Sequence, residues 1–312
     1  MSRAGLLAVA GGALLVAVGL TVAEVGEEPG ALPNWQALIL GIVQGATELL
    51  PISSSGHLIL VPWFGGWEYL EQNDEFNQTF DVALHVGTLV AVVSYFWADV
   101  KRLVAAWLAS VRRRRIETPD ERVAWFVAVA TVPAALIGAL GENVIAEHLG
   151  EPWQIAITLA VFGILLWIAD RTPARRGMAD LGPGTAVAVG LAQSLALMPG
   201  VSRSGITITA ARFLGLDRDS AARFSFLLLI PIVFGASLWK GVTDVLLGDL
   251  PPGSAGPFLV GVISSAAAGL LAIWALLGYV RNHSYTLFVV YRLVLAAIIV
   301  LLIVTNVLEP TF

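Results

Sequence analysis

The chain lacks cysteine altogether and carries little charge for its length. The absence of cysteine from its 312 residues excludes disulfides, thiolate metal sites and cysteine nucleophiles. Charged residues make up 13% of the chain, against about 25% in soluble domains. Hydrophobic residues reach 57% and the mean hydropathy is +0.80. This composition excludes an ordinary cytosolic enzyme and predicts a polytopic membrane protein. The basic residues lie in short loops, so nucleic acid is not an expected partner.

Apolar runs long enough to cross a bilayer recur along the chain, since about 20 residues span the hydrocarbon. Seven are continuous, at 4–23, 79–98, 123–141, 152–169, 224–247, 257–280 and 286–308. The first follows Arg3 and is either a cleaved signal peptide or an extra helix. Its length favours an extra helix within an N-terminal extension, 1–30, ahead of a single membrane domain, 31–312.

The loops between these runs differ in their content of Lys and Arg. Loop 99–122 holds seven Lys and Arg residues and loop 170–183 holds three Arg, whereas 65–78 and 142–151 contain neither Lys nor Arg. Because cytoplasmic loops carry the excess of Lys and Arg, 99–122, 170–183 and 281–285 are predicted inside. Segments 24–35, 65–78, 142–151, 248–256 and the C-terminus are then outside.

Two further apolar stretches, 36–64 and 184–211, are interrupted by Pro, Gly and Ser. Each is flanked by loops assigned to the same side, so each is predicted to be a re-entrant helical hairpin. Irregular backbone at membrane depth is tolerated where protein buries it or a wet cavity receives it. The expected fold is therefore all-α, with two re-entrant hairpins, about six full spans and the extra N-terminal helix.

The interrupted stretches also resemble each other. Aligning 41–56 with 190–205 gives five matches without a gap: Gly41/Gly190, Gln44/Gln193, Ser53/Ser202, Ser55/Ser204 and Gly56/Gly205. Three spans separate the copies, so the second is upside down relative to the first. This predicts an inverted repeat, with units at about 36–141 and about 152–280 and a last span at 286–308. In such folds half-helix N-termini point at anions near the midplane.

The hairpins carry the polar residues of an anion site. In the first, residues 36–50 predict a half-helix stopped by Pro51, and the return is expected to start around His57. Gln44 and Glu48 share one helix face, and a carboxylate within an apolar segment indicates a functional site. In the second, Arg203 must meet a carboxylate or a phosphate, and its planar fork suits both. Together with serines at helix starts, this inventory predicts a membrane phosphate site.

A divalent cation is compatible with these residues, since carboxylate and amide oxygens suit Mg²⁺ or Ca²⁺. Glu48 and Gln44 are the predicted metal ligands. They form only a weak site by themselves, so substrate phosphate oxygens would supply the remaining ligands. A diphosphate head group beside lipid favours an amphiphilic substrate.

At these residues the chain resembles the undecaprenyl-diphosphate phosphatases, also known as bacitracin-resistance proteins. One signature is Gln44-Gly45-Ala46-Thr47-Glu48 with Ser53-Ser54-Ser55 and His57, and the other runs from Pro199-Gly200 through Ser202-Arg203-Ser204 to Thr207. The likeness extends from about Trp35 to the C-terminus and includes Tyr291-Arg292. Segment 1–30 is an addition to the usual family chain, and Gln44 stands where some members have Glu.

The resemblance implies a hydrolase that removes the terminal phosphate of undecaprenyl diphosphate and so recycles the lipid carrier for cell-wall synthesis. It implies a multi-pass protein of the bacterial inner membrane with a site open to the outer face, a divalent cation, and bacitracin resistance through competition for the same lipid. A homodimer is one possible assembly of the protein. The predicted catalytic residues are Glu48, Ser54, His57 and Arg203. The predicted substrate-binding residues are Ser53, Ser55, Ser202, Ser204, Thr207 and Gln193.

Alternatives stay open at this point. Ser54 as nucleophile with His57 as general base, and direct attack by water that His57 activates, are both compatible with the residues. A transporter or flippase for a polyprenyl phosphate would use the same inverted repeat. The phosphatidic-acid-phosphatase type is excluded, because no histidine follows Ser202-Arg203 until His283. His85 is expected to pack rather than to line the site.

Overall fold

The computed structural model describes residues 31–246 and 251–310, and every regular element in these ranges is helical. In chain order the main helices are α2 (Asn34–Leu49), α3 (Ser54–Gly65), α4 (Glu68–Gln72), α5 (Asp74–Tyr95), α6 (Trp97–Arg113), α7 (Pro119–His148), α8 (Pro152–Ala169), α9 (Pro183–Gln193), α10 (Arg203–Phe213), α11 (Arg218–Lys240), α12 (Ala255–Val280) and α13 (Thr286–Val304). Short turns of other helix types lie at Met178–Asp180, Ser194–Leu197 and Gly241–Leu246. The predicted all-α class is confirmed.

Within the described ranges, six helices are long and apolar enough to cross a membrane, as expected for a multi-pass membrane protein. They are Phe76–Tyr95, Pro119–Gly141, Pro152–Ala169, Arg218–Thr243, Ala255–Val280 and Thr286–Val304. These coincide with six of the seven predicted runs. The seventh, 4–23, and the extension 1–30 lie outside the described residues.

Three sequence-based boundaries are wrong. The supposed loop 99–122 contains α6. Charged residues lie among the apolar residues of this helix and lower its mean hydropathy below that of a span. Helix α7 continues through most of 142–151 to His148. The return helix α3 starts at Ser54 rather than around His57, because Ser53 caps its first turn.

Both interrupted stretches form a helix, a break and a second helix. Helix α2 ends at Leu49 because Leu50 is extended ahead of Pro51. Helix α9 ends at Gln193, and a single 3-10 turn precedes Pro199-Gly200. That each pair enters and leaves by one membrane face stays a prediction, as do the domain limits.

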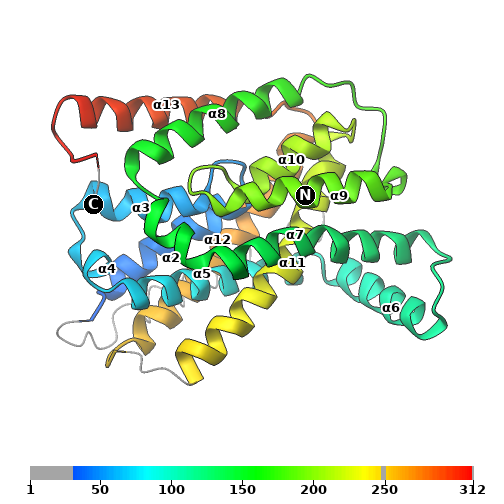
Figure 1. Cartoon of the computed structure of the whole chain (residues 1–312), viewed down its shortest axis with the longest axis horizontal. Helices are drawn as coiled ribbons and strands as arrows, with labels where there is room; N and C mark the ends of the chain where they lie inside the picture. The colour runs from blue at the N-terminus through cyan, green and yellow to red at the C-terminus, as the bar shows by residue number, and fades with distance from the viewer. Residues whose placement is uncertain (1–30, 247–250, 311–312) are drawn as a thin grey trace.

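The helices of the two halves pair reciprocally. Helix α2 packs mainly against α12, and α9 packs against α7; α5 pairs with α11 and α8 with α13. Figure 1 shows α8 and α13 side by side along one edge of the molecule. Exchanging the halves preserves these pairings, as a twofold relation between the repeats requires. The pairing favours α8 as the end of the first unit and α13 as the end of the second.

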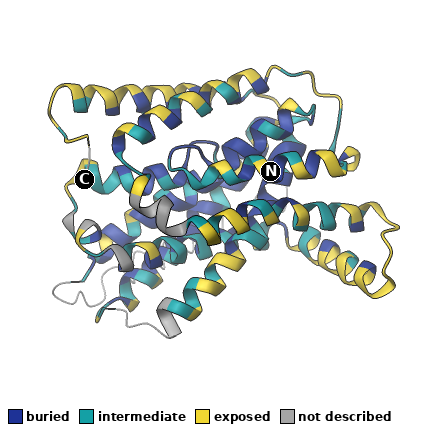
Figure 2. Cartoon of the chain, viewed as in Figure 1, coloured by how far each residue is buried: buried dark blue, intermediate teal, exposed yellow. Residues whose placement is uncertain are grey.

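Glycines that are equivalent in the repeat permit two close helix packings. A Cβ on Gly41 would lie 2.5 Å from the Gly261 carbonyl oxygen of α12, and one on Gly190 would lie 2.6 Å from the Ala130 carbonyl oxygen of α7. Small residues let helix backbones approach closely in membrane proteins. The repeat therefore preserves the helix contacts that bring the two breaks together in the buried centre of the molecule (Figure 2).

Gly41→Ala is expected to lower the free energy of unfolding by about 1–3 kcal/mol, because the added methyl group overpacks the α2–α12 contact. Gly278→Ala is the matched control, since a Cβ on this α12 glycine meets nothing within 4 Å. Thermal unfolding of the two variants in detergent compares them. Equal melting temperatures would contradict the close approach of α2 and α12.

Candidate functional site

The two returning helices, α3 and α10, begin with the same local structure. Ser53 and Ser202 are their N-caps, both at a φ of 75°, and each side-chain oxygen accepts a hydrogen bond from the amide three residues on, at Gly56 and Gly205. A non-glycine residue in this region of φ is strained, and such strain concentrates at functional sites. The repeat thus places two helix N-termini at the centre of the molecule.

Hydrogen bonds join the two breaks directly. The Gly200 amide donates to Ser53 Oγ over 3.0 Å, and Ser204 Oγ donates to the Leu50 carbonyl over 2.9 Å. The same serine that caps α3 therefore also holds the second break. Gly200 has a φ of 89° and lies against Thr158, so a larger residue would be strained and crowded there. The breaks form one structural unit.

Arg292 of α13 secures this unit from the other side. Its side chain is fully buried, and its three nitrogens donate to backbone carbonyls from α8 and from both breaks. The acceptors are Leu159, Thr158, Pro51, Gly200 and Val201, at 2.9–3.3 Å. A buried guanidinium without a carboxylate needs such acceptors, so Arg292 positions the breaks and is itself enclosed.

Glu48 is the centre of the polar cluster. Its Oε1 accepts from Arg203 Nε at 3.0 Å, and its Oε2 accepts from the Ser54 hydroxyl. Gln44 Nε2 and His85 Nε2 each lie 3.4 Å from Oε2. The Glu48 side chain is 4% exposed. A buried carboxylate can remain charged here because it pairs with Arg203 and both groups are hydrogen-bonded. The first hairpin supplies the carboxylate, and the second supplies the cation.

Arg203 keeps part of its guanidinium without a protein acceptor. Nε binds Glu48, and Nη1 donates to the Ser225 carbonyl over 2.8 Å. Among the described residues Nη2 is buried and has no hydrogen-bond partner. Thr207 donates to Ser225 Oγ over 2.7 Å, which ties α10 to α11 below the arginine. A buried donor without a partner is costly, and an anion oxygen would satisfy it.

His57 does not contact Ser54 in this arrangement. Its Nδ1 lies 2.6 Å from the Ser53 carbonyl oxygen, and its Nε2 lies 2.7 Å from the hydroxyl of Tyr291, whose ring stacks on the imidazole. Glu48, rather than His57, accepts the Ser54 hydrogen bond. Catalytic hydrogen bonds can rearrange when substrate binds, so the role of His57 as general base stays a prediction.

The structure brings most of the predicted residues together. Gln44, Glu48, Ser53, Ser54, Ser202, Arg203, Ser204 and Thr207 belong to one connected network around the breaks, which Ser55 joins through Ser53. Gln193 instead donates to the Ala130 carbonyl of α7. It therefore contributes to the α7–α9 contact, and none of its described contacts reaches Glu48.

Four further residues belong to the site region: His85, Ser225, Tyr291 and Arg292. The expectation that His85 only packs is wrong, because it lies 3.4 Å from Glu48. An ionisable group within an apolar run is the signal that also pointed to Glu48 and Arg203. The same signal identifies His85 and Arg292. Ser225 carries no such signal, because its role rests on its carbonyl and on its neighbour α10.

The residues present fit a divalent cation in part. No group of three or more His, Asp or Glu side chains suited to a metal occurs among the described residues. Gln44 Oε1, however, is buried and has no hydrogen-bond partner among the described residues. Gln44 lies one helical turn before Glu48, and its Nε2 donates to the Glu48 carboxylate. These oxygens suit a cation whose other ligands come from phosphate.

Comparisons with known proteins identify the family of this chain. The family model described as "Bacitracin resistance protein BacA" matches residues 37–298. This chain belongs to that family. It is 44% identical over 270 residues to an undecaprenyl-diphosphatase of Desulforudis audaxviator, covering 86% of this chain and 97% of the relative. It is 46% identical over 267 residues to one of Moorella thermoacetica (85% and 96%) and 48% identical over 259 residues to one of Geobacter sulfurreducens (82% and 93%).

Membership confirms the resemblance carried by the two signatures, both of which lie within the matched range. The names of these three relatives describe a phosphatase, and none describes a transporter. The transporter alternative is therefore without support from the comparisons.

The contacts of His57 predict its tautomer. The Ser53 carbonyl only accepts, so Nδ1 carries the proton and the neutral ring accepts from Tyr291 at Nε2. In Tyr291→Phe, the ¹⁵N resonance of Nε2 is expected to move toward that of a nitrogen without a donor, while Nδ1 stays protonated. Histidine-selective ¹⁵N NMR measures this, with Tyr95→Phe as the control. A proton on Nε2 in the unsubstituted protein would contradict the arrangement.

Proposed function

We propose that this protein hydrolyses undecaprenyl diphosphate to undecaprenyl phosphate and inorganic phosphate. The observation that carries the proposal is the buried Glu48–Arg203 pair. Glu48 also accepts from Ser54, both Ser54 and Arg203 begin a helix, and Arg203 Nη2 has no hydrogen-bond partner among the described residues. Such an arrangement can bind a phosphate and stabilise the charge of a phosphoryl-transfer transition state. Family membership and the names of the relatives support the same substrate.

In the mechanism we infer, Arg203 and the N-terminus of α10 bind the oxygens of the terminal phosphate. With Ser54 as nucleophile, Oγ bonds to the terminal phosphorus while the bond from phosphorus to the bridging oxygen breaks. In place of His57, Glu48 is the group that we propose takes the hydroxyl proton, since it already accepts that hydrogen bond. Undecaprenyl phosphate leaves, and water then hydrolyses the phosphoserine. Direct attack by water is the second route, and a phosphoserine trapped by rapid quenching distinguishes the two.

We further propose that the reaction depends on Mg²⁺ or Ca²⁺, held by Glu48 and the Gln44 side-chain oxygen together with the substrate. When bound, the cation would neutralise negative charge on the diphosphate. The protein is proposed to act in the bacterial inner membrane with the site open to the outer face, and to oppose bacitracin by competing for the lipid. A homodimer stays a prediction.

The exposed surface is suited to a lipid substrate. One face of α13 is exposed (Figure 2). The exposed residues include the apolar Val290 and Val294 and the half-exposed Tyr291, whose hydroxyl contacts His57. A polyprenyl chain lying along this face would bring its head group to the breaks without leaving lipid. This supports an amphiphilic substrate over a soluble one.

Glu48→Gln and Arg203→Lys are expected to reduce phosphate release from undecaprenyl diphosphate by about 10²–10³-fold, the effect of removing a transition-state charge contact. Lysine retains the charge of Arg203 but cannot bind Glu48 and a phosphate with a planar fork. Glu309→Gln and Arg175→Lys, both at exposed positions, are the matched controls. The assay uses purified protein in detergent. No release by folded, unsubstituted protein would refute the proposed function.

Chelation is expected to abolish release, and added Mg²⁺ or Ca²⁺ to restore it. Gln44→Glu should lower the cation concentration needed for half-maximal rate by about tenfold, because a second carboxylate strengthens a site for a hard cation. Gln193→Glu is the control, since it is the repeat equivalent and contacts α7 instead. An equal shift in both variants, or full activity in chelator, would contradict the proposed cation site.

A further inference from the structure

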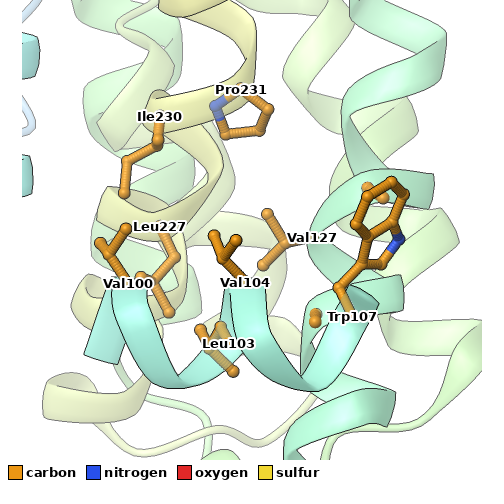
Figure 3. Close-up of a pocket in the computed structure, with 10 residues that line it drawn as sticks. Val100, Leu103, Val104, Trp107, Val127, Leu227, Ile230 and Pro231 are labelled. Carbon is orange, nitrogen blue, oxygen red and sulfur yellow. The ribbon is translucent and has the colours of Figure 1, made fainter. Parts of the chain in front are cut away.

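An apolar groove lies between α6, α7 and α11, away from the phosphate site. Its volume is about 240 Å³, and every residue that lines it is apolar. Val104 and Trp107 of α6, Val127 of α7, and Leu227 and Pro231 of α11 point into it (Figure 3). Ser225 of α11 contacts Arg203 on another side of that helix, since two residues correspond to about 200° of rotation. The groove is therefore separate from the polar cluster.

Helix α6 presents an apolar stripe that other helices leave uncovered. Val104, Leu108 and Val111 recur at helical spacing and are all about half exposed. The helix as a whole is amphipathic and carries Lys101 and Arg102 near its start and Arg112 and Arg113 in its last turn. A helix of this kind is typical of the interface between water and lipid. In Figure 1 it forms, with the start of α7, a corner that projects from one end of the molecule.

Cationic side chains without partners gather at the end of this helix. Arg113 pairs with Glu117 and Glu121, and Arg102 pairs with Asp99 and Asp120, so the acidic residues of the corner already have basic partners. Arg112, Arg114 and Arg115 are exposed, and none forms an ion pair with a described residue. They lie on the side predicted to face the cytoplasm. A net positive cluster thus adjoins the apolar groove on the same helix.

The spacing of groove and cluster matches a phospholipid. Leu227 and Pro231 lie 9 and 13 residues after Arg218, the start of a membrane span, or about 14–20 Å along the helix. The groove therefore reaches hydrocarbon depth. Arg114 lies seven residues beyond Trp107, about 10 Å, toward the charged end. An acyl chain in the groove would place its head group near the arginines.

We propose that this groove binds one acyl chain of an anionic glycerophospholipid whose phosphate is held by Arg114 and Arg115. A zwitterionic lipid brings no net negative charge to the arginines, and the groove offers no polar side chain to a partner protein. The site is independent of the phosphatase reaction, so either proposal can fail without the other.

Native mass spectrometry of the full chain in detergent tests the proposal, with phosphatidylglycerol and phosphatidylcholine titrated in parallel. Phosphatidylglycerol is expected to bind more tightly at one site. Arg115→Gln should weaken its binding about fivefold, the equivalent of about 1 kcal/mol per basic residue near a membrane surface. Arg175→Gln, on the other loop predicted to be cytoplasmic, should leave it unchanged.

The groove itself is tested by Val104→Trp, which narrows it, against Val161→Trp at a similarly exposed position of α8. Only Val104→Trp should reduce retention of phosphatidylglycerol, by about tenfold, while elution volume and melting temperature stay unchanged. Equal binding of the two lipids, equal effects of the paired variants, or displacement of phosphatidylglycerol by inorganic phosphate would overturn the proposal. A dimer that Val104→Trp dissociates would show that a second copy occupies the groove, and would also overturn the proposal. Retention of phosphatidylglycerol that rises when residues 1–30 are removed would assign the groove to those residues instead, with the same consequence.

Discussion

The structure depends on how Arg292 is satisfied. A guanidinium buried in a membrane protein is costly, and here no carboxylate of the described residues neutralises it. Instead it donates to carbonyls of α8 and of both interrupted stretches. Those carbonyls belong to backbone that no helix satisfies, and backbone at membrane depth must be satisfied within the protein. The guanidinium thus supplies donors to unpaired carbonyls, and the carbonyls supply acceptors to the guanidinium. This exchange holds the two breaks in place at the site.

The inverted repeat explains why the site contains opposite charges. Each unit contributes the same frame: a glycine that permits close helix packing, a capping serine and a helix N-terminus at the centre. Within this frame the first unit carries Glu48 and the second carries Arg203. Because the frames interlock through Gly200 and Ser53, the two charges meet at 3.0 Å although 155 positions separate them. Symmetry of the backbone and asymmetry of the side chains together form an anion site.

The polar centre and the lipid-facing periphery are physically separate. Helix α11 contributes to both, since Ser225 supports Arg203 while Leu227 lines the groove beside α6. The exposed residues of α6 and α13 are apolar, so lipid covers surfaces that water would disfavour. A lipid bound at α6 would contact the outside of the same helix that positions the arginine.

Several features could be predicted from the sequence because they depend on local composition. Apolar length identified the six spans, and Pro51 and Pro199-Gly200 identified the breaks. The register of Ser53 with Ser202 revealed the repeat, and ionisable residues within apolar runs revealed Glu48 and Arg203. Helix α6 was missed because it is amphipathic. It lacks the long apolar run that identifies a span, and no turn residues mark where it begins.

The sequence by itself determined which segments cross, where they are interrupted and which residue types meet there, since these follow from the cost of placing polar groups in lipid. Only the tertiary structure decided the partners. In the structure Ser54 donates to Glu48 and His57 contacts Tyr291. His85 lies beside Glu48, whereas Gln193 contacts α7. Those pairings depend on how helices far apart in the chain pack at Gly41 and Gly190, and on which carbonyls Arg292 reaches. Such contacts have no signature in local sequence.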